Sequence, residues 1–230
     1  MLISAADLHV RGTESIINGI EQAVSVLMKM GYKAIALSID LSSVDAELSS
    51  KLKVLKRISR SEKRISILYR VNVMGDDLKR VRDLLSKLGK CRTRHYIVGV
   101  RPLSKSVARN VVRDRRVSIV YFDPLHLLKF FDESQATLMR DNNVVLEIPF
   151  HMFVLNNVLE LSIRALSKAL RICLKKDCTI IVTSYASSIF ELRSPYQLAS
   201  LLSVVGVPLE MCLPFVSSRP MKIAEEKLGG

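Results

Sequence analysis

Four polar residues lie where short apolar runs end, and their types could hold a divalent metal ion. Asp7 and His9 lie near the end of the first run, Asp40 follows the second, and Glu147 lies in the sixth. If these runs are parallel strands, their carboxyl ends lie at one edge of the sheet, so that the four side chains converge. Carboxylates and imidazoles placed together in this way could bind a divalent metal and hydrolyse a phosphoester.

The residues around Asp7 are the sharpest sign of such a site. Residues 7–11 read Asp-Leu-His-Val-Arg, which resembles the Asp-x-His-x-His opening of the polymerase-and-histidinol-phosphatase barrels. Arg11 replaces the second histidine, so a ligand is lost and a cation is added. A metal-dependent phosphoesterase using Asp7, His9, Asp40 and Glu147 is therefore the alternative hypothesis. We favour the interpretation that the carboxylates cap helices or pair with arginines.

Residues 51–116 carry most of the positive charge. This segment holds 21 of the 35 Lys and Arg residues but 5 of the 22 Asp and Glu residues. Apolar runs such as residues 65–69 interrupt it at strand-like intervals, so the charge belongs to a folded scaffold. The formal net charge of +13 and the pI of about 9.8 favour a nucleic-acid partner over an acidic small molecule.

The arginines that flank the predicted strands are the main candidates for RNA contact, because a guanidinium can bind a phosphate through two bonds. The basic segment contains the aromatic residues Tyr69 and Tyr96 alone. This scarcity favours recognition of phosphate and shape over base stacking. Helical Lys53, Lys56, Lys79 and Lys87 are interpreted as a solvated face. We expect the following RNA-binding residues to gather on one side of the fold: Arg70, Arg92, Arg94, Arg101, Arg113, Arg115, Arg116, His126 and Lys129.

Short β-rich runs recur along the chain, and helical patterns lie between several of them. Strands are expected at residues 2–10, 34–39, 65–73, 95–100, 117–122, 144–148 and 179–183. This alternation predicts parallel strands with helical crossovers. We predict an α/β fold, a TIM-barrel-like β/α barrel of about seven parallel strands with surrounding helices, in a single domain over residues 1–230. An open doubly wound sheet is the alternative, although the first turn lacks the GxGxxG pattern of a dinucleotide site.

Local signals indicate helix ends and the cellular compartment. Thr13 is placed to cap a helix that Gly31 ends, and Ser194 with Gln197 forms a capping box.

No uncharged apolar run reaches the ~18 residues that a membrane span needs. The start of the sequence lacks the pattern of a signal peptide. The four cysteines show no CxxC spacing, and we expect a cytoplasmic protein with reduced cysteines and no membrane partner.

Three segments near the carboxyl end carry a resemblance to a known family. They read IVTSYA at 181–186, FELRSPYQL at 190–198 and LLSVVG at 201–206, and Asp7-Leu8-His9-Val10, Gly31-Tyr32 and Arg115-Arg116-Val117 agree in order. The chain resembles the thirty-kilodalton protein subunit of ribonuclease P, called component 3 in archaea. The turn at 184–186 reads Ser-Tyr-Ala where this resemblance leads us to expect a glycine.

The resemblance implies a barrel-like fold in a ribonucleoprotein that cuts the 5′ leader from precursor tRNA. It implies that the RNA performs the chemistry with magnesium, and that the protein alone binds no cofactor and is not catalytic. The implied partners are the ribonuclease P RNA and protein component 2, with precursor tRNA as the substrate of the complex. Arg193 is then a structural residue of its turn. A scaffold whose basic face binds an acidic protein is a third hypothesis.

Overall fold

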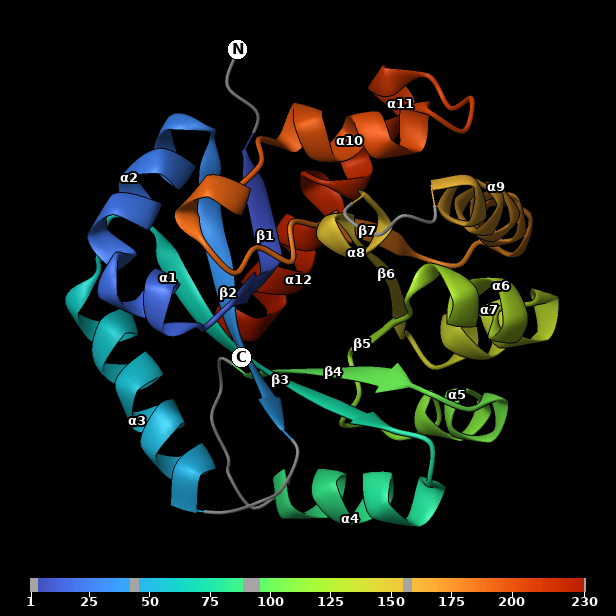
Figure 1. Cartoon of the computed structure of the whole chain (residues 1–230), viewed down its shortest axis with the longest axis horizontal. Helices are drawn as coiled ribbons and strands as arrows, with labels where there is room; N and C mark the ends of the chain where they lie inside the picture. Colours follow the sequence, from blue (N-terminus) through green and yellow to red (C-terminus); the bar gives the residue numbers. More distant parts are fainter. Residues whose placement is uncertain (1–3, 42–45, 89–95, 155–158, 230) are drawn as a thin grey trace.

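Seven parallel strands form one sheet in chain order, and the sheet curls into a nearly closed barrel (Figure 1). The computed structural model describes residues 4–41, 46–88, 96–154 and 159–229. The strands are β1 (Ala5–Arg11), β2 (Tyr32–Leu41), β3 (Ser66–Gly75), β4 (Tyr96–Pro102), β5 (Ile119–Tyr121), β6 (Val145–Pro149) and β7 (Ile180–Thr183). The predicted barrel is confirmed, and the open doubly wound sheet is wrong.

Strands β1 and β7 face each other at the seam of the barrel. The backbone N–H of Arg11 donates to the carbonyl of Ala186 at 2.8 Å, and the N–H of Ser184 donates to the Asp7 carboxylate at 3.2 Å. The register of β1 on β2 shifts between Asp7 and Val10. Such a bulge re-aims a side chain, and here the side chain of His9 joins the polar residues inside the barrel.

Helices cover the outside of the barrel, and their ends follow local chemistry. Gly31 adopts a left-handed φ of 96° after the second helix, and both bonds of the Ser194–Gln197 capping box are present, as predicted. Arg193 donates to the carbonyls of Phe190 and Leu192, which confirms its structural role. The helices are α1 (Glu14–Asn18), α2 (Ile20–Lys29), α3 (Ala46–Ser61), α4 (Leu78–Leu88), α5 (Lys105–Val111), α6 (Pro124–Phe130), α7 (Glu133–Asp141), α8 (Phe150–Val154), α9 (Leu159–Lys176), α10 (Pro195–Ser203), α11 (Leu209–Cys212) and α12 (Ser218–Gly229), with 3₁₀ turns η1 (Ile189–Glu191) and η2 (Leu213–Phe215).

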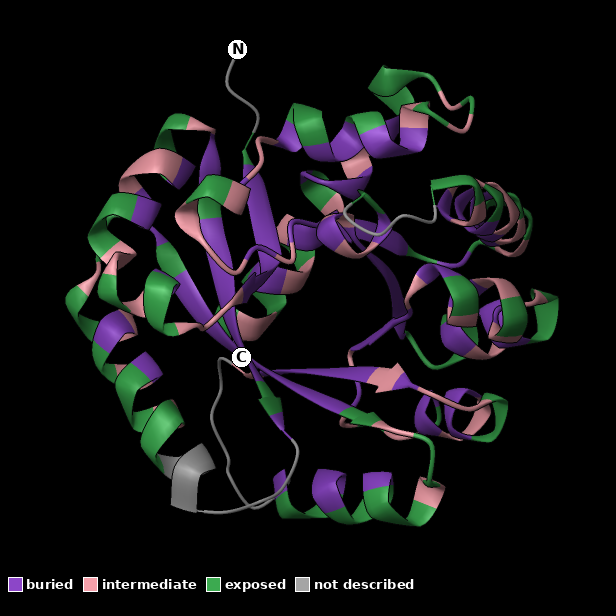
Figure 2. Cartoon of the chain, viewed as in Figure 1, coloured by how far each residue is buried: buried purple, intermediate pink, exposed green. Residues whose placement is uncertain are grey.

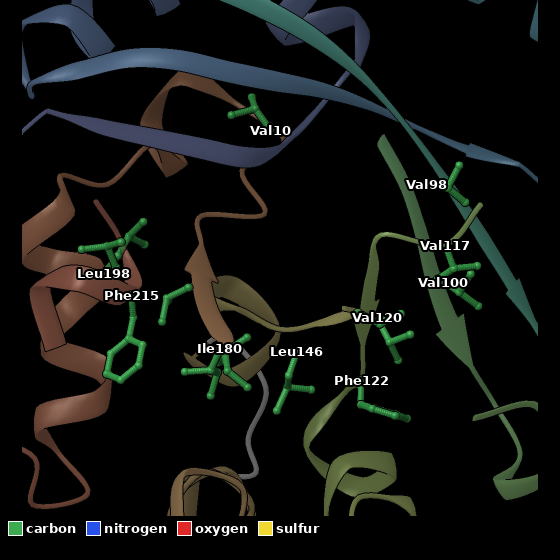
Figure 3. Packing of buried hydrophobic residues seen from close by; sticks show 14 of the residues in the cluster. Val10, Val98, Val100, Val117, Val120, Phe122, Leu146, Ile180, Leu198 and Phe215 are labelled. Carbon is green, nitrogen blue, oxygen red and sulfur yellow. The ribbon is translucent and has the colours of Figure 1, made fainter. Parts of the chain in front are cut away.

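The main apolar core lies between the sheet and the helices. Strand residues such as Val100, Val120, Leu146 and Ile180 belong to it (Figure 3). The strands are buried almost throughout, whereas the helices expose their outer faces (Figure 2). This pattern is typical of parallel strands that helices cover.

A second, smaller apolar cluster fills the inside of the barrel. It consists of Ala6, Leu8, Ala34, Ala36, Leu68, Ile97, Ile119, Val145, Ile181 and Ala224. Ala224 belongs to α12, which contacts β1, β2, β3 and β7 and closes the barrel where the strands begin. The sequence patterns did not indicate α12, because few of its residues are apolar.

The segment between β5 and β6 forms α6 and α7, although the sequence patterns predicted no helix there. The Asp123 carboxylate accepts from the N–H of His126 at 2.9 Å and caps α6. Asp132 caps α7 in the same way through Gln135 at 2.9 Å. None of the described helices combines the length and the apolar character that a membrane span requires.

Candidate functional site

The predicted metal ligands converge at the carboxyl ends of the strands, but they surround an arginine. Arg70 of β3 is 0% exposed. Its Nη2 donates to Glu147 Oε2 at 2.5 Å, its Nη1 to the carbonyl of Leu8 at 2.9 Å, and its Nε to Asn72 Oδ1 at 2.7 Å. All three nitrogens of the guanidinium therefore have partners inside the barrel.

Gly99 of β4 leaves room for this guanidinium. A Cβ atom at Gly99 would lie 2.7 Å from Nη2 of Arg70 and 2.5 Å from Oδ1 of Asn72, which is too close for either atom. A glycine inside a strand often marks such a close approach. Gly99, within a predicted strand, is therefore the signal in the sequence that could have indicated the buried Arg70 side chain.

The carboxylate of Glu147 has hydrogen-bond partners on both oxygens. Oε1 accepts from His9 Nδ1 at 2.7 Å and from Thr183 Oγ1 at 2.5 Å, while Oε2 accepts from Arg70. Burial acts to raise the pKa of Glu147, but the positive charge of Arg70 and the hydrogen bonds lower it to about 2. Glu147 is consequently ionised at neutral pH and forms a buried ion pair.

The same network fixes the tautomer of His9. Its Nδ1 faces the Glu147 carboxylate, and its Nε2 lies 2.9 Å from the side-chain amide nitrogen of Asn72. Because a carboxylate accepts and an amide N–H donates, Nδ1 carries the proton and Nε2 accepts. Burial and the charge of Arg70 lower the pKa of His9. His9 is therefore neutral at pH 7, and its lone pair is already engaged.

The two aspartates have other protein partners. Asp7 accepts from the backbone N–H groups of His9 and Ser184, each at 3.2 Å, and burial raises the pKa of Asp7. Asp40 accepts from the Asn72 amide at 3.0 Å and lies 3.5 Å from Nη2 of Arg11. Pairing of carboxylates with arginines, the favoured interpretation, is confirmed for Asp40 and Glu147.

These contacts do not fit the metal site of the alternative hypothesis. Asp7, His9, Asp40 and Glu147 are all bonded to protein groups, and the charge of Arg70 at their centre would repel a divalent cation. Within the described residues, no group of three or more His, Cys, Asp or Glu side chains is placed to hold a metal. The phosphoesterase hypothesis is therefore wrong: the positive charge among these four residues is the guanidinium of Arg70, in the place that a metal ion would take.

A cavity of about 310 Å³ lies at the mouth of the barrel, and Tyr185 is part of its wall. Tyr185 has a φ of 58°, in the left-handed region that favours glycine. The glycine expected from the family resemblance would adopt this conformation without strain. The ring of Tyr185 instead packs edge-on against His9, with centroids 4.6 Å apart, and lies 5.2 Å from the Arg11 guanidinium.

The predicted RNA-binding residues do not form one surface. The prediction that Arg70 binds RNA was wrong, because RNA cannot reach a guanidinium that the barrel encloses. Arg101 lies next to the end of β4, at the carboxyl edge of the sheet, and pairs with Asp123 at 2.8 Å. Arg113, Arg115 and Arg116 precede β5 and lie at the opposite, amino-terminal edge. The expectation that these residues gather on one side is therefore corrected.

The remaining predicted residues differ in how far their charge is already neutralised. Arg116 pairs with Asp114 at 2.6 Å, and His126 Nδ1 lies 2.6 Å from Asp123 Oδ2. The structure exposes Arg113, Arg115 and Lys129, and none of the three has an ion pair with a described residue. Arg92 and Arg94 lie outside the described residues.

The fold and the central site define a TIM-barrel-like α/β protein whose polar cluster is built around an internal ion pair instead of a metal. The chain belongs to the ribonuclease P subunit p30 family, whose profile matches residues 4–228. The resemblance found in the sequence is thereby confirmed.

One relative in sequence and two solved structures are similar to this chain. Ribonuclease P protein component 3 of Methanosarcina mazei is 25% identical over 216 residues, covering 93% of this chain and 85% of the relative. A cryo-EM structure of archaeal ribonuclease P with mature tRNA contains a chain that matches with a TM-score of 0.74 at 18% identity, over 98% of this chain and 93% of that one. A putative prolidase of Bifidobacterium longum matches at a TM-score of 0.62 and 11% identity, over 98% of this chain and 70% of that one. At these identities, the structural likenesses show the barrel fold alone.

Proposed function

We propose that this chain is the protein subunit of ribonuclease P that binds and supports the catalytic RNA while the complex removes the 5′ leader of precursor tRNA. The family match over residues 4–228 carries the proposal. The net charge of +13 supports it, because a compact barrel needs no such excess of cations to fold.

The mechanism is electrostatic. A folded RNA brings phosphates close together, and Lys and Arg side chains at its surface neutralise them and release counterions. The protein thereby lowers the magnesium concentration that the RNA needs to fold and to cleave. Among the residues predicted from the sequence, exposed Arg113, Arg115 and Lys129 are the best suited to this role, since they have no ion pair with a described residue.

The central polar network stabilises the barrel and does not carry out hydrolysis. His9 cannot serve as a general base while Asn72 occupies its lone pair, and Glu147 is held by Arg70, His9 and Thr183. The chemistry then belongs to the RNA and its magnesium ions. Protein component 2 is the proposed protein partner, precursor tRNA is the substrate of the complex, and the cytoplasm is the proposed location.

Reconstitution tests the function directly. The catalytic RNA is assayed for precursor-tRNA cleavage over a magnesium titration, with this chain, with component 2, with both, and with neither. We expect the chain, together with component 2, to lower the magnesium concentration at half-maximal rate. An unrelated protein of equal net charge serves as the control. Superimposable titrations with and without the chain would overturn the proposal.

A further inference from the structure

Helix α3 carries four cations that no described residue neutralises. Lys53, Lys56, Arg57 and Arg60 form no ion pair with any described residue, and Lys56 alone of the four is partly covered. From Ser50 to Ser61 the helix contains no acidic residue. The strand-flanking Arg70, Arg101 and Arg116, in contrast, are all held by carboxylates.

The helix is anchored so that these cations face outward. Leu55 and Ile58 are 1% and 9% exposed and pack in the main core, and the Ser59 hydroxyl donates to the carbonyl of Ile67 at 3.0 Å. Because residues three and four apart share one face of a helix, Lys53, Lys56, Arg57 and Arg60 form a stripe about 10 Å long. The exposed outer face of α3 is visible at the lower left of Figure 2.

The spacing of these cations lowers the stability of α3 as an isolated helix. Lys53 with Arg57, and Lys56 with Arg60, are like charges four residues apart, and such pairs destabilise a helix. A face that served only solvation would gain from alternating acids and bases. A stripe of one sign is favourable when a polyanion covers it.

The shape of this face fits a phosphate backbone. Lys53, Lys56, Arg57, Arg60 and Ser61 line an open groove of about 500 Å³, without an aromatic side chain on which a base could stack. Backbone contact, rather than base reading, is the binding mode of such a surface. Because β3 begins shortly after α3 ends, Arg60 lies at the amino-terminal edge of the barrel, the edge that also bears Arg113 and Arg115.

We infer that the outward face of α3, formed by Lys53, Lys56, Arg57 and Arg60, is a docking surface for the phosphate backbone of the ribonuclease P RNA. This inference rests on the proposed function and assigns its RNA contact to a helix. It replaces the interpretation of Lys53 and Lys56 as a merely solvated face.

Two double variants with the same net charge test the surface. R57Q/R60Q removes two guanidinium groups from α3. R164Q/R171Q removes two exposed guanidinium groups from α9, on the other side of the barrel (Figure 1). Gln is a good helix former, and both pairs are exposed, so both variants keep the wild-type circular dichroism and neither melts at a lower temperature than the wild type. R57K/R60K retains the charge and serves as the rescue variant.

The readout is filter binding of the full chain to in vitro transcribed ribonuclease P RNA over a series of salt concentrations. Two lost phosphate contacts should weaken binding by about 10- to 30-fold at ~0.15 M salt, and lower the slope of log K against log salt by about 1.4–1.8. R164Q/R171Q should bind as the wild type does, since the Debye length of ~8 Å at this salt screens distant charges. R57K/R60K should restore most of the affinity.

The possible outcomes distinguish failure of the proposed docking surface from failure of the proposed function. Wild-type affinity of R57Q/R60Q, or equal weakening by both double variants, overturns the docking surface while leaving the proposed function in place. Failure of the wild-type chain to bind the RNA overturns the proposed function itself. Mature tRNA is the second probe, and tighter α3-dependent binding to it than to the ribonuclease P RNA would overturn the choice of partner.

Discussion

Replacing Arg70 by methionine tests whether the internal ion pair holds the barrel together. R70M keeps a long unbranched side chain but leaves Glu147 buried without its cation. Removing one partner of a buried ion pair costs about 3–5 kcal/mol, because an uncompensated charge remains. The pKa of Glu147 gives a similar size, since a fall from 4.5 to about 2 corresponds to on the order of 3 kcal/mol. We therefore expect R70M to lower the free energy of unfolding at neutral pH by about 3–5 kcal/mol.

Acid should reduce this cost. The folded-state pKa of Glu147 lies below its ordinary value of 4.5, so its ionisation stabilises the wild type fully above that value, and this stabilisation is lost as the pH falls towards 2. In R70M the buried carboxyl takes up a proton in the acid range, which removes the penalty of an unpaired charge. Urea unfolding followed by circular dichroism should show a smaller difference between wild type and variant at about pH 3 than at about pH 7.

Two further variants decide whether the cause is the buried charge. R116M removes an arginine whose ion pair with Asp114 lies at the surface, with 36% of the arginine side chain exposed, and should cost less than ~1 kcal/mol. R70M/E147Q removes both charges and should recover most of the lost stability. The reasoning is refuted if R70M costs as little as R116M, if its cost does not change with pH, or if R70M/E147Q is no more stable than R70M.

Other predictions concern packing and capping. G99A places a methyl group against Arg70 and Asn72 and should lower the free energy of unfolding by about 1–3 kcal/mol, whereas G229A, which meets no atom within 4 Å, should not. Equal melting temperatures for the two alanine variants would contradict this account. S194A removes the cap of α10 and should cost about 1 kcal/mol in urea unfolding. A cost equal to that of S200A, within the same helix, would show that the cap contributes nothing.

The barrel could be predicted because each of its strands has a recognisable local sequence pattern. Runs such as residues 34–39 and 65–73 are apolar and β-rich, and helical patterns separate most of them, so parallel pairing in chain order follows. Helices α6, α7 and α12 were not predicted, and the reasons for α6 and α12 differ. Asp123 and Pro124 are a helix start that also looks like a strand end, and α12 is held by packing under the barrel, which no local pattern records.

The location of the candidate site could be predicted from the sequence, but the buried ion pair at its centre could not. Strand ends indicated that Asp7, His9 and Glu147 would meet, and they do. That Arg70 would turn inward depends on the period-two alternation of β3 and on the space left by Gly99, a contact between residues 29 positions apart in the sequence. The charge pattern of a sequence counts cations but does not record their partners. It could not distinguish Arg116, which pairs with Asp114, from Arg57, which has no ion pair with a described residue.

Helix α12 makes completion of the barrel depend on residues far from β1 along the chain. Ala224 packs beneath strands that lie at the other end of the described sequence, so the floor of the barrel joins its earliest and its latest segments. Contacts of such long separation form slowly, because loop entropy is lost before the contact is gained. We therefore expect the interior of the barrel to stay accessible to water during folding until α12 packs against β1, β2, β3 and β7.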